Sequence, residues 1–249
     1  MIRAKHTDGY SLVELLVVII IVGVIASVAI DGLNKVTETG RYEETMLELD
    51  QLADATIGQA DLITGGSRVD YGYVGDVGSM PISLDNLVNR PGGYVTWNGP
   101  YIHDDFYAAA GGSETEYRLD AWGTAYTFGA NYIRSTGSGS NISRRLANSP
   151  SDLLYNEADV LLLNLDLYPP GPVYRDSVTV TIHYPRGGVM TSSTVNPRAD
   201  GLAVIDSLPI GLHLVEIAWL PTADTVRYRL GVNPGKHSYL EIQLNGGVW

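Results

Sequence analysis

One carboxylate lies inside a long apolar stretch close to the start of the chain. Residues 10–30 contain a single charged side chain, Glu14, and residues 15–30 contain none. As a helix, this stretch spans about 32 Å, which is close to the thickness of the hydrocarbon core of a bilayer. A carboxylate buried there costs about 2.5–3.5 kcal/mol on insertion scales, and an ordinary anchor gains nothing from it. The pattern therefore predicts a membrane-spanning helix in which Glu14 has a functional partner.

A partner for this carboxylate can be produced by cutting the chain after Gly9. The short leader before that point carries Arg3 and Lys5, and cleavage would create an α-ammonium group on Tyr10. The new amine and Glu14 lie about one helical turn apart, and the positive end of the helix dipole also favours a carboxylate in the first turn. Between neighbouring subunits, the same pair would fix one helix against the next at a defined offset.

This segment resembles the cleavage and methylation segment of type IV prepilins and of the pseudopilins of type II secretion. The resemblance implies that a prepilin peptidase cuts between Gly9 and Tyr10, that the new amine is N-methylated, and that Glu14 pairs with the N-terminus of an adjacent subunit. Two residues depart from the family pattern: Tyr10 replaces the usual phenylalanine, and Asp31 stands where a proline is common. The matching residues are Gly9, Tyr10, Ser11, Leu12, Glu14, Leu15, Val17, Val18, Ile19, Gly23, Ala26 and Ser27.

A plain membrane anchor or a cleaved secretory signal is the alternative interpretation of the same stretch. Residues 26–29, Ala-Ser-Val-Ala, loosely offer the small side chains that a signal cleavage site needs. Neither alternative explains a carboxylate within the apolar core. We therefore expect a leader peptide at residues 1–9, a transmembrane part at residues 10–30, and a single-pass anchor in the inner membrane.

Composition excludes several function classes. The chain has 28 acidic and 16 basic residues and a net charge of −12, so no basic patch is available for nucleic acid. Cysteine is absent, which excludes disulfides and thiolate chemistry. The 249 residues suffice for one large or two small domains after the anchor.

The helix is expected to continue beyond the membrane to residue 64, where Gly65 and Gly66 would end it. Apolar or small residues at spacings of three and four define a stripe that should pack on a globular domain. The opposite, acidic face is interpreted as a solvated surface or as a contact with another subunit. The stripe consists of Tyr42, Met46, Leu49, Ala53, Ile57 and Ala60, and the acidic face of Glu43, Glu44, Glu48, Asp50 and Asp54.

Residues 65–167 are rich in turn signals and predict a small, loop-rich globular domain. Residues 83–89 suggest a short helical turn, and residues 117–128 suggest two strands joined at residues 121–123. The order of these motifs around the W-N-G-P-Y-I segment at residues 97–102 is similar to that in the major pseudopilin of type II secretion. The resemblance therefore implies a pseudopilin-like domain with a small β-sheet.

A loop near the end of the domain holds calcium in that family. The acidic residues that could do so here are Asp152, Glu157 and Asp159. Their spacing lacks the dense oxygen ligands that calcium prefers, so a solvated acidic loop is the alternative. Calcium is thus a hypothesis, and no other cofactor is expected.

A proline-rich segment at residues 168–172 precedes a β-rich region that extends to residue 249. Five segments alternate with period two and are bounded by glycine and proline turns, which predicts a small antiparallel β-sandwich. Residues 200–217 resemble the hairpin of transthyretin-like, carboxypeptidase-regulatory-like sandwiches. The five segments are residues 177–184, 202–205, 213–218, 225–232 and 238–244.

Catalytic motifs are not evident. The five histidines are far apart and form no H-x-x-x-H pattern, and the chain has no G-x-S-x-G elbow. We therefore do not expect an enzyme.

The expected fold class is α+β: a long N-terminal helix, half membrane-spanning and half amphipathic, packed on a small pseudopilin domain and followed by a β-sandwich. The expected function is that of a structural subunit of a type II secretion pseudopilus or type IV pilus-like filament. The alternative is a low-copy tip subunit or adhesin whose sandwich binds a secreted substrate or surface ligand. Expected partners are other pilin or pseudopilin subunits, prepilin peptidase, the inner-membrane assembly platform and lipid, with the globular domains in the periplasm or outside the cell.

Overall fold

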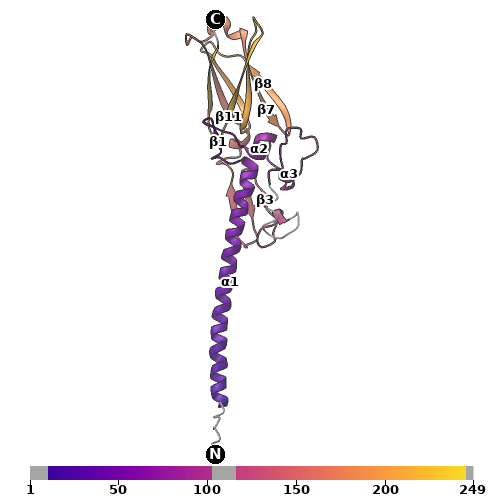
Figure 1. The fold of residues 1–249 in the computed structure, drawn as a ribbon, viewed down its shortest axis with the longest axis vertical. Coiled ribbons are helices and arrows are strands. Elements are labelled where there is room, and N and C mark those ends of the chain that lie inside the picture. Colours follow the sequence, from indigo (N-terminus) through magenta and orange to yellow (C-terminus); the bar gives the residue numbers. More distant parts are fainter. Residues whose placement is uncertain (1–10, 103–115, 245–248) are drawn as a thin grey trace, which may run out of the picture. The chain divides into compact units, whose positions relative to one another are not determined.

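The computed structural model describes residues 11–102, 116–244 and 249. The chain divides into two compact units, Met1–Glu44 and Thr45–Trp249. Helix α1, Leu12–Ile57, begins in the first unit and ends in the second, and β-sheets follow it (Figure 1). This arrangement confirms the predicted α+β fold class.

The first unit consists of the apolar part of α1 and its polar continuation. Within the described residues, α1 is the one helix that is long and apolar enough to cross a membrane. Its most apolar 18 residues are not buried by the rest of the chain. Leucine, valine, isoleucine and alanine make up most of this part, so its helix exposes apolar side chains on every side. A helix of this kind requires lipid or other helices around it.

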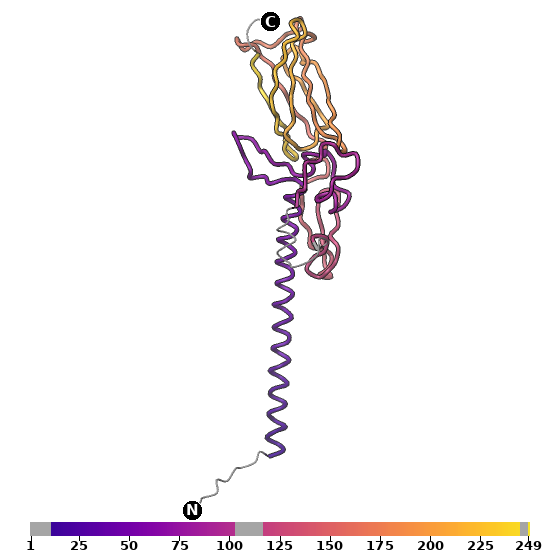
Figure 2. Tube along the Cα trace, turned by 45° about the vertical axis from the view of Figure 1, so that its right-hand side comes forward, coloured from indigo at the N-terminus to yellow at the C-terminus, as the bar shows by residue number. Residues whose placement is uncertain are grey.

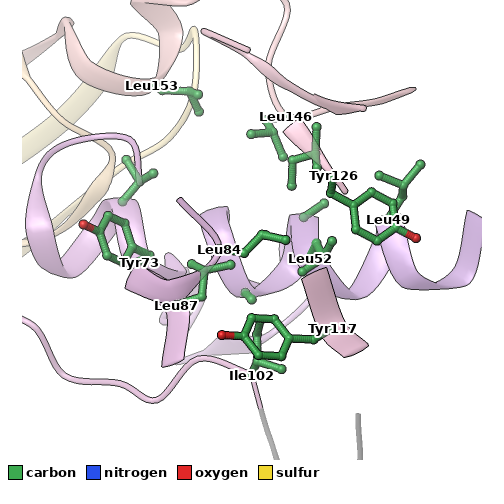
Figure 3. Packing of buried hydrophobic residues seen from close by; sticks show 14 of the residues in the cluster. Leu49, Leu52, Tyr73, Leu84, Leu87, Ile102, Tyr117, Tyr126, Leu146 and Leu153 are labelled. Atoms are coloured by element: carbon green, nitrogen blue, oxygen red, sulfur yellow. The ribbon is translucent and has the colours of Figure 1, made fainter. Parts of the chain in front are cut away.

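The amphipathic part of α1 buries one face in the second unit. Leu49 and Ala53 of the predicted stripe are buried, and Leu52 extends the buried face. Tyr42 and Ala60, in contrast, are exposed, so the stripe is shorter than predicted at both ends. Figure 3 shows Leu49 and Leu52 among the apolar side chains of this core.

Two residues of the acidic face contact the chain's own globular part, so the prediction of a face directed to solvent or another subunit is wrong for them. The Tyr126 hydroxyl donates a hydrogen bond to Glu48, and Arg144 forms an ion pair with Asp50 at 2.9 Å. Glu43 and Glu44 are exposed as predicted.

The helix ends at Ile57, seven residues before the predicted end. Gly58 adopts a left-handed conformation with φ +76°, and its N–H donates to the carbonyl of Asp54 at 2.7 Å. The guanidinium of Arg68 donates to the last carbonyls, those of Ile57 at 2.5 Å and Gly58 at 3.0 Å. These donors satisfy carbonyl groups that a helix end leaves without partners.

Gly65 and Gly66, which were predicted to end the helix, form the turn of a small hairpin. Strand β1, Ile63–Thr64, pairs with β2, Ser67–Arg68, in an antiparallel register. Both glycines have positive φ angles, as the turn requires.

The first hydrophobic core joins α1 to short elements that lie between residues 71 and 154. The predicted pair of strands about residues 121–123 is present as an antiparallel bridge between Leu119 and Ala125. Three further strands form a sheet in the order β3-β4-β5. The elements are α2 Gly72–Val77, α3 Asp85–Val88, η1 Glu116–Arg118, β3 Thr127–Phe128, β4 Tyr132–Ser135, β5 Ile142–Arg145 and α5 Ser151–Leu154.

The second core lies between two sheets, with strand orders β11-β10-β7-β8 and β12-β6-β9. All pairs are antiparallel except β6 and β12, which are parallel. The predicted antiparallel sandwich is therefore mixed at this one pair. The elements are β6 Asn156–Asn164, α6 Gly171–Tyr174, η2 Arg175–Ser177, β7 Val178–Arg186, β8 Val189–Val195, β9 Leu202–Leu208, β10 Gly211–Trp219, β11 Asp224–Val232 and β12 Ser238–Leu244 (Figure 2).

Two strands of the sandwich lie outside the five predicted segments. Strand β6 precedes the predicted boundary at residue 168, so the proline-rich segment connects two strands of the sandwich and does not separate two domains. Strand β8 has no fully buried residue, and its polar sequence gives no alternating signal.

The two cores are linked through backbone hydrogen bonds. Gly188, between β7 and β8, donates to Val77 at 2.8 Å and accepts from Thr96 at 3.0 Å. Ile210, between β9 and β10, donates to Leu153 at 3.0 Å, and its side chain belongs to the first core. The sandwich and the pseudopilin-like domain therefore form one continuous unit.

Candidate functional site

The N-terminus of α1 is capped by Ser11. Its Oγ accepts a hydrogen bond from the backbone N–H of Glu14 at 3.2 Å, and its carbonyl accepts one from Leu15 at 3.1 Å. Glu14 lies in the first turn, where the helix dipole favours a negative charge. Gly9 and Tyr10, the predicted cleavage and methylation residues, lie outside the described residues.

The apolar surface around Glu14 is exposed along its whole length. The large apolar side chains from Leu12 to Ile30 are between 47% and 81% exposed. A Cβ added at Gly23 would meet no atom within 4 Å, so this side of the helix is open to close approach by another helix. The arrangement can insert into lipid and can also pack against identical helices.

The D-A-W-G-T-A-Y turn is organised by the carboxylate of Asp120, which is 4% exposed. Oδ1 accepts hydrogen bonds from the N–H groups of Trp122 at 3.0 Å and Thr124 at 2.8 Å. Oδ2 accepts from Ser135 Oγ at 2.5 Å and from the N–H of Gly137 at 3.1 Å. One buried carboxylate thus ties the turn to strand β4.

The W-N-G-P-Y segment forms a second polar centre. The indole N–H of Trp97 donates to the carbonyl of Asn86 at 2.8 Å, which joins the segment to α3. The Tyr101 hydroxyl donates to Asp76 in α2 at 2.9 Å, and burial raises the pKa of both groups. The segment therefore connects two short helices and has a structural role.

The structure separates the three calcium candidates. Asp152 lies in α5, and its two oxygens accept from the N–H of Ser149 at 3.0 Å and from its Oγ at 2.5 Å. Glu157 and Asp159 both lie on β6 and converge on His237, which precedes β12. Sequence reasoning missed His237 because the parallel pairing of β6 with β12 brings together residues about 80 positions apart.

Comparison with known proteins agrees with this geometry. Residues 5–30 match the family described as the prokaryotic N-terminal methylation motif. The type II secretion system core protein G of Xanthomonas campestris pv. campestris is 25% identical over 118 residues, which are 47% of this chain and 73% of that protein. Both matches support a protein of the pseudopilin family.

One solved structure matches part of the chain. The Bacillus anthracis TIE protein is 14% identical, with a TM-score of 0.29, over 49% of this chain and 24% of its own. This similarity is too low to support a conclusion about fold or function. The likeness of the sandwich to transthyretin-like domains stays a prediction from sequence.

Proposed function

We propose that this protein is a structural subunit of a type II secretion pseudopilus. The observation that carries the proposal is the apolar half of α1, which is exposed throughout and begins at the capped turn with Glu14. Such a surface is stable in lipid before assembly and in contact with neighbouring helices after it. The match of residues 5–30 to the methylation motif supports the same role.

In the proposed mechanism, cleavage between Gly9 and Tyr10 creates an amine that pairs with Glu14 of a neighbouring subunit. Lipid already satisfies apolar side chains, so helix association depends on polar pairs and close packing. The amine and Glu14 form the polar pair, and the small residues Gly23 and Ala26 allow close packing of the helices. The pair also determines the axial offset between subunits, since each helix has one carboxylate near its start.

The proposal includes a single-pass inner-membrane anchor at residues 10–30 with the globular unit in the periplasm. Prepilin peptidase and the assembly platform are the proposed partners besides other pilin subunits. The proposed role is non-catalytic, and the similarity to a type II secretion system core protein supports it. The comparisons do not favour the alternative of a low-copy tip subunit or adhesin.

Glu14→Gln tests this mechanism, with Glu43→Gln as the matched control. Both changes remove one exposed carboxylate from α1 in the same way. Interhelical polar contacts in membranes are worth about 1–2 kcal/mol, so we expect sheared filament yield to fall roughly five- to thirtyfold for Glu14→Gln. The amount in the membrane fraction should be unchanged in both variants.

Filament yield from Glu14→Gln equal to that of Glu43→Gln would contradict the pairing mechanism. Intact-mass measurement of the extracted protein supplies a separate check. The product should begin at Tyr10 and carry one added methyl group only in cells that contain prepilin peptidase.

A further inference from the structure

Three potential metal ligands converge where β12 begins beside β6. In the described sheet, β12 is an edge strand whose partner is β6, and their register places Ser238 opposite Ala158 and Tyr239 opposite Asp159. His237 therefore lies beside the outward face of β6 that carries Glu157 and Asp159. Two segments at opposite ends of the sandwich sequence meet in this cluster.

The geometry of the cluster fits coordination of one small cation. His237 Nε2 is 2.8 Å from Asp159 Oδ2, and Nδ1 is 3.4 Å from Glu157 Oε1. One ligand atom from each residue lies within 4.8 Å of the other two. Two atoms bound to zinc at about 2.0–2.1 Å are roughly 2.9–3.4 Å apart, so His237 and Asp159 need little movement. The half-exposed Glu157 side chain can reach the same point by rotation.

The second oxygen of Asp159 is an independent indication of a ligand. The Asp159 side chain is 18% exposed, whereas His237 and Glu157 are each 49% exposed. Asp159 Oδ1 is fully buried and has no hydrogen-bond partner in the part of the chain that the structure describes. A buried acceptor without a partner is costly, and a cation beside this carboxylate would offset that cost. With a neutral imidazole, the cluster carries two negative charges, which match one divalent ion.

The donor set selects the class of metal. Calcium and magnesium prefer sites made wholly of oxygen, whereas imidazole nitrogen suits zinc, nickel and copper. Three ligands from the chain leave a fourth position on the exposed side for water. We propose that Glu157, Asp159 and His237 bind a divalent transition-metal ion, represented by Zn²⁺, which fastens the edge strand β12 to β6. This proposal concerns the sandwich and does not depend on filament assembly.

The test is a titration of the metal-free, full-length protein in detergent with zinc chloride at pH 7.5, beside a matched titration with calcium chloride. We expect zinc binding that is lost when residues of the cluster are replaced, and a Tm rise of about 5–10 °C at a Zn²⁺ concentration a hundredfold above Kd. His237→Ala and Glu157→Gln should each weaken zinc binding at least tenfold. His183→Ala, which removes a half-exposed histidine of β7 outside the cluster, should leave zinc binding unchanged.

Glu157→Gln preserves the size of an exposed side chain, so it tests the site even where His237→Ala disturbs folding. Zinc affinity unchanged in Glu157→Gln and His237→Ala would overturn the proposal. Calcium binding as tight as zinc binding would overturn the assignment to a transition metal. Zinc binding that leaves amide hydrogen exchange in β12 as fast as in the metal-free protein would overturn the role in fastening β12.

Discussion

Asp120→Ala is expected to lower the free energy of unfolding by about 3–5 kcal/mol. The carboxylate accepts four hydrogen bonds, and its removal takes away all four, although the N–H of Gly137 keeps a longer bond of 3.3 Å to Ser135 Oγ. Ser135 is fully buried and Gly137 is half-buried, so each lost charge-assisted bond there costs about 1–3 kcal/mol. Trp122 and Thr124 are half-buried like Gly137, so water can replace part of what these three N–H groups lose, and the buried Ser135 hydroxyl contributes most.

The measurement is denaturant unfolding of the full-length protein in detergent, followed by tryptophan fluorescence. Asp61→Ala is the control, since Asp61 is an exposed carboxylate in the same unit and its loss should change stability by about 0.5 kcal/mol or less. Asp120→Asn retains one acceptor oxygen and should fall between the wild type and Asp120→Ala. A loss below about 1 kcal/mol for Asp120→Ala would refute the view that this carboxylate organises the turn.

Two further predictions concern the end of α1 and a buried histidine. Gly58→Ala places a Cβ 2.5 Å from the backbone of Asp70 in a residue with φ +76°, so the free energy of unfolding should fall by at least about 1–2 kcal/mol, measured by the same unfolding assay. Gly40→Ala, in the exposed helix interior, should instead be neutral or stabilising by up to about 1 kcal/mol. Burial lowers the pKa of His213, so the unfolded chain binds its proton more tightly. Stability from this group is therefore complete above about pH 6.5 and falls as the pH decreases, by at most about 1.4 kcal/mol per pH unit. His213→Gln should flatten the dependence of unfolding free energy on pH between 7.5 and 5, and an unchanged slope would contradict this assignment.

The features that could be predicted from sequence are those encoded locally. An apolar run with one carboxylate specifies the first half of α1, and period-two alternation specifies strands such as β7, whose inward residues are all buried. The burial of Leu49 and Ala53 likewise follows from their helical spacing. These patterns depend on residues a few positions apart, so one sequence is enough to read them.

The features that could not be predicted depend on partners distant in sequence. A glycine that follows a helical pattern is a signal for the helix end, and both Gly58 and Gly65 fit it. Gly58 ends α1 because Arg68 and the backbone of Asp70 contact it, whereas Gly65 lies in the turn of a hairpin. The predicted boundary at residue 168 leaves strand β6 outside the sandwich. Its partners in the sheet, β9 and β12, follow it by about 40 and 80 residues, so no local pattern links them. The role of His237 depends on the same parallel pairing.

The backbone links between the two cores have a mechanical consequence. Gly188 bonds to both Val77 and Thr96, and Ile210 bonds to Leu153, so force applied to the C-terminal part of α1 reaches the sandwich through several parallel attachments. A flexible tether would let the sandwich lag and rotate under drag, whereas these attachments resist shear together. A subunit that is displaced along its axis would therefore move its sandwich with it, and the sandwich would keep its orientation relative to the first core.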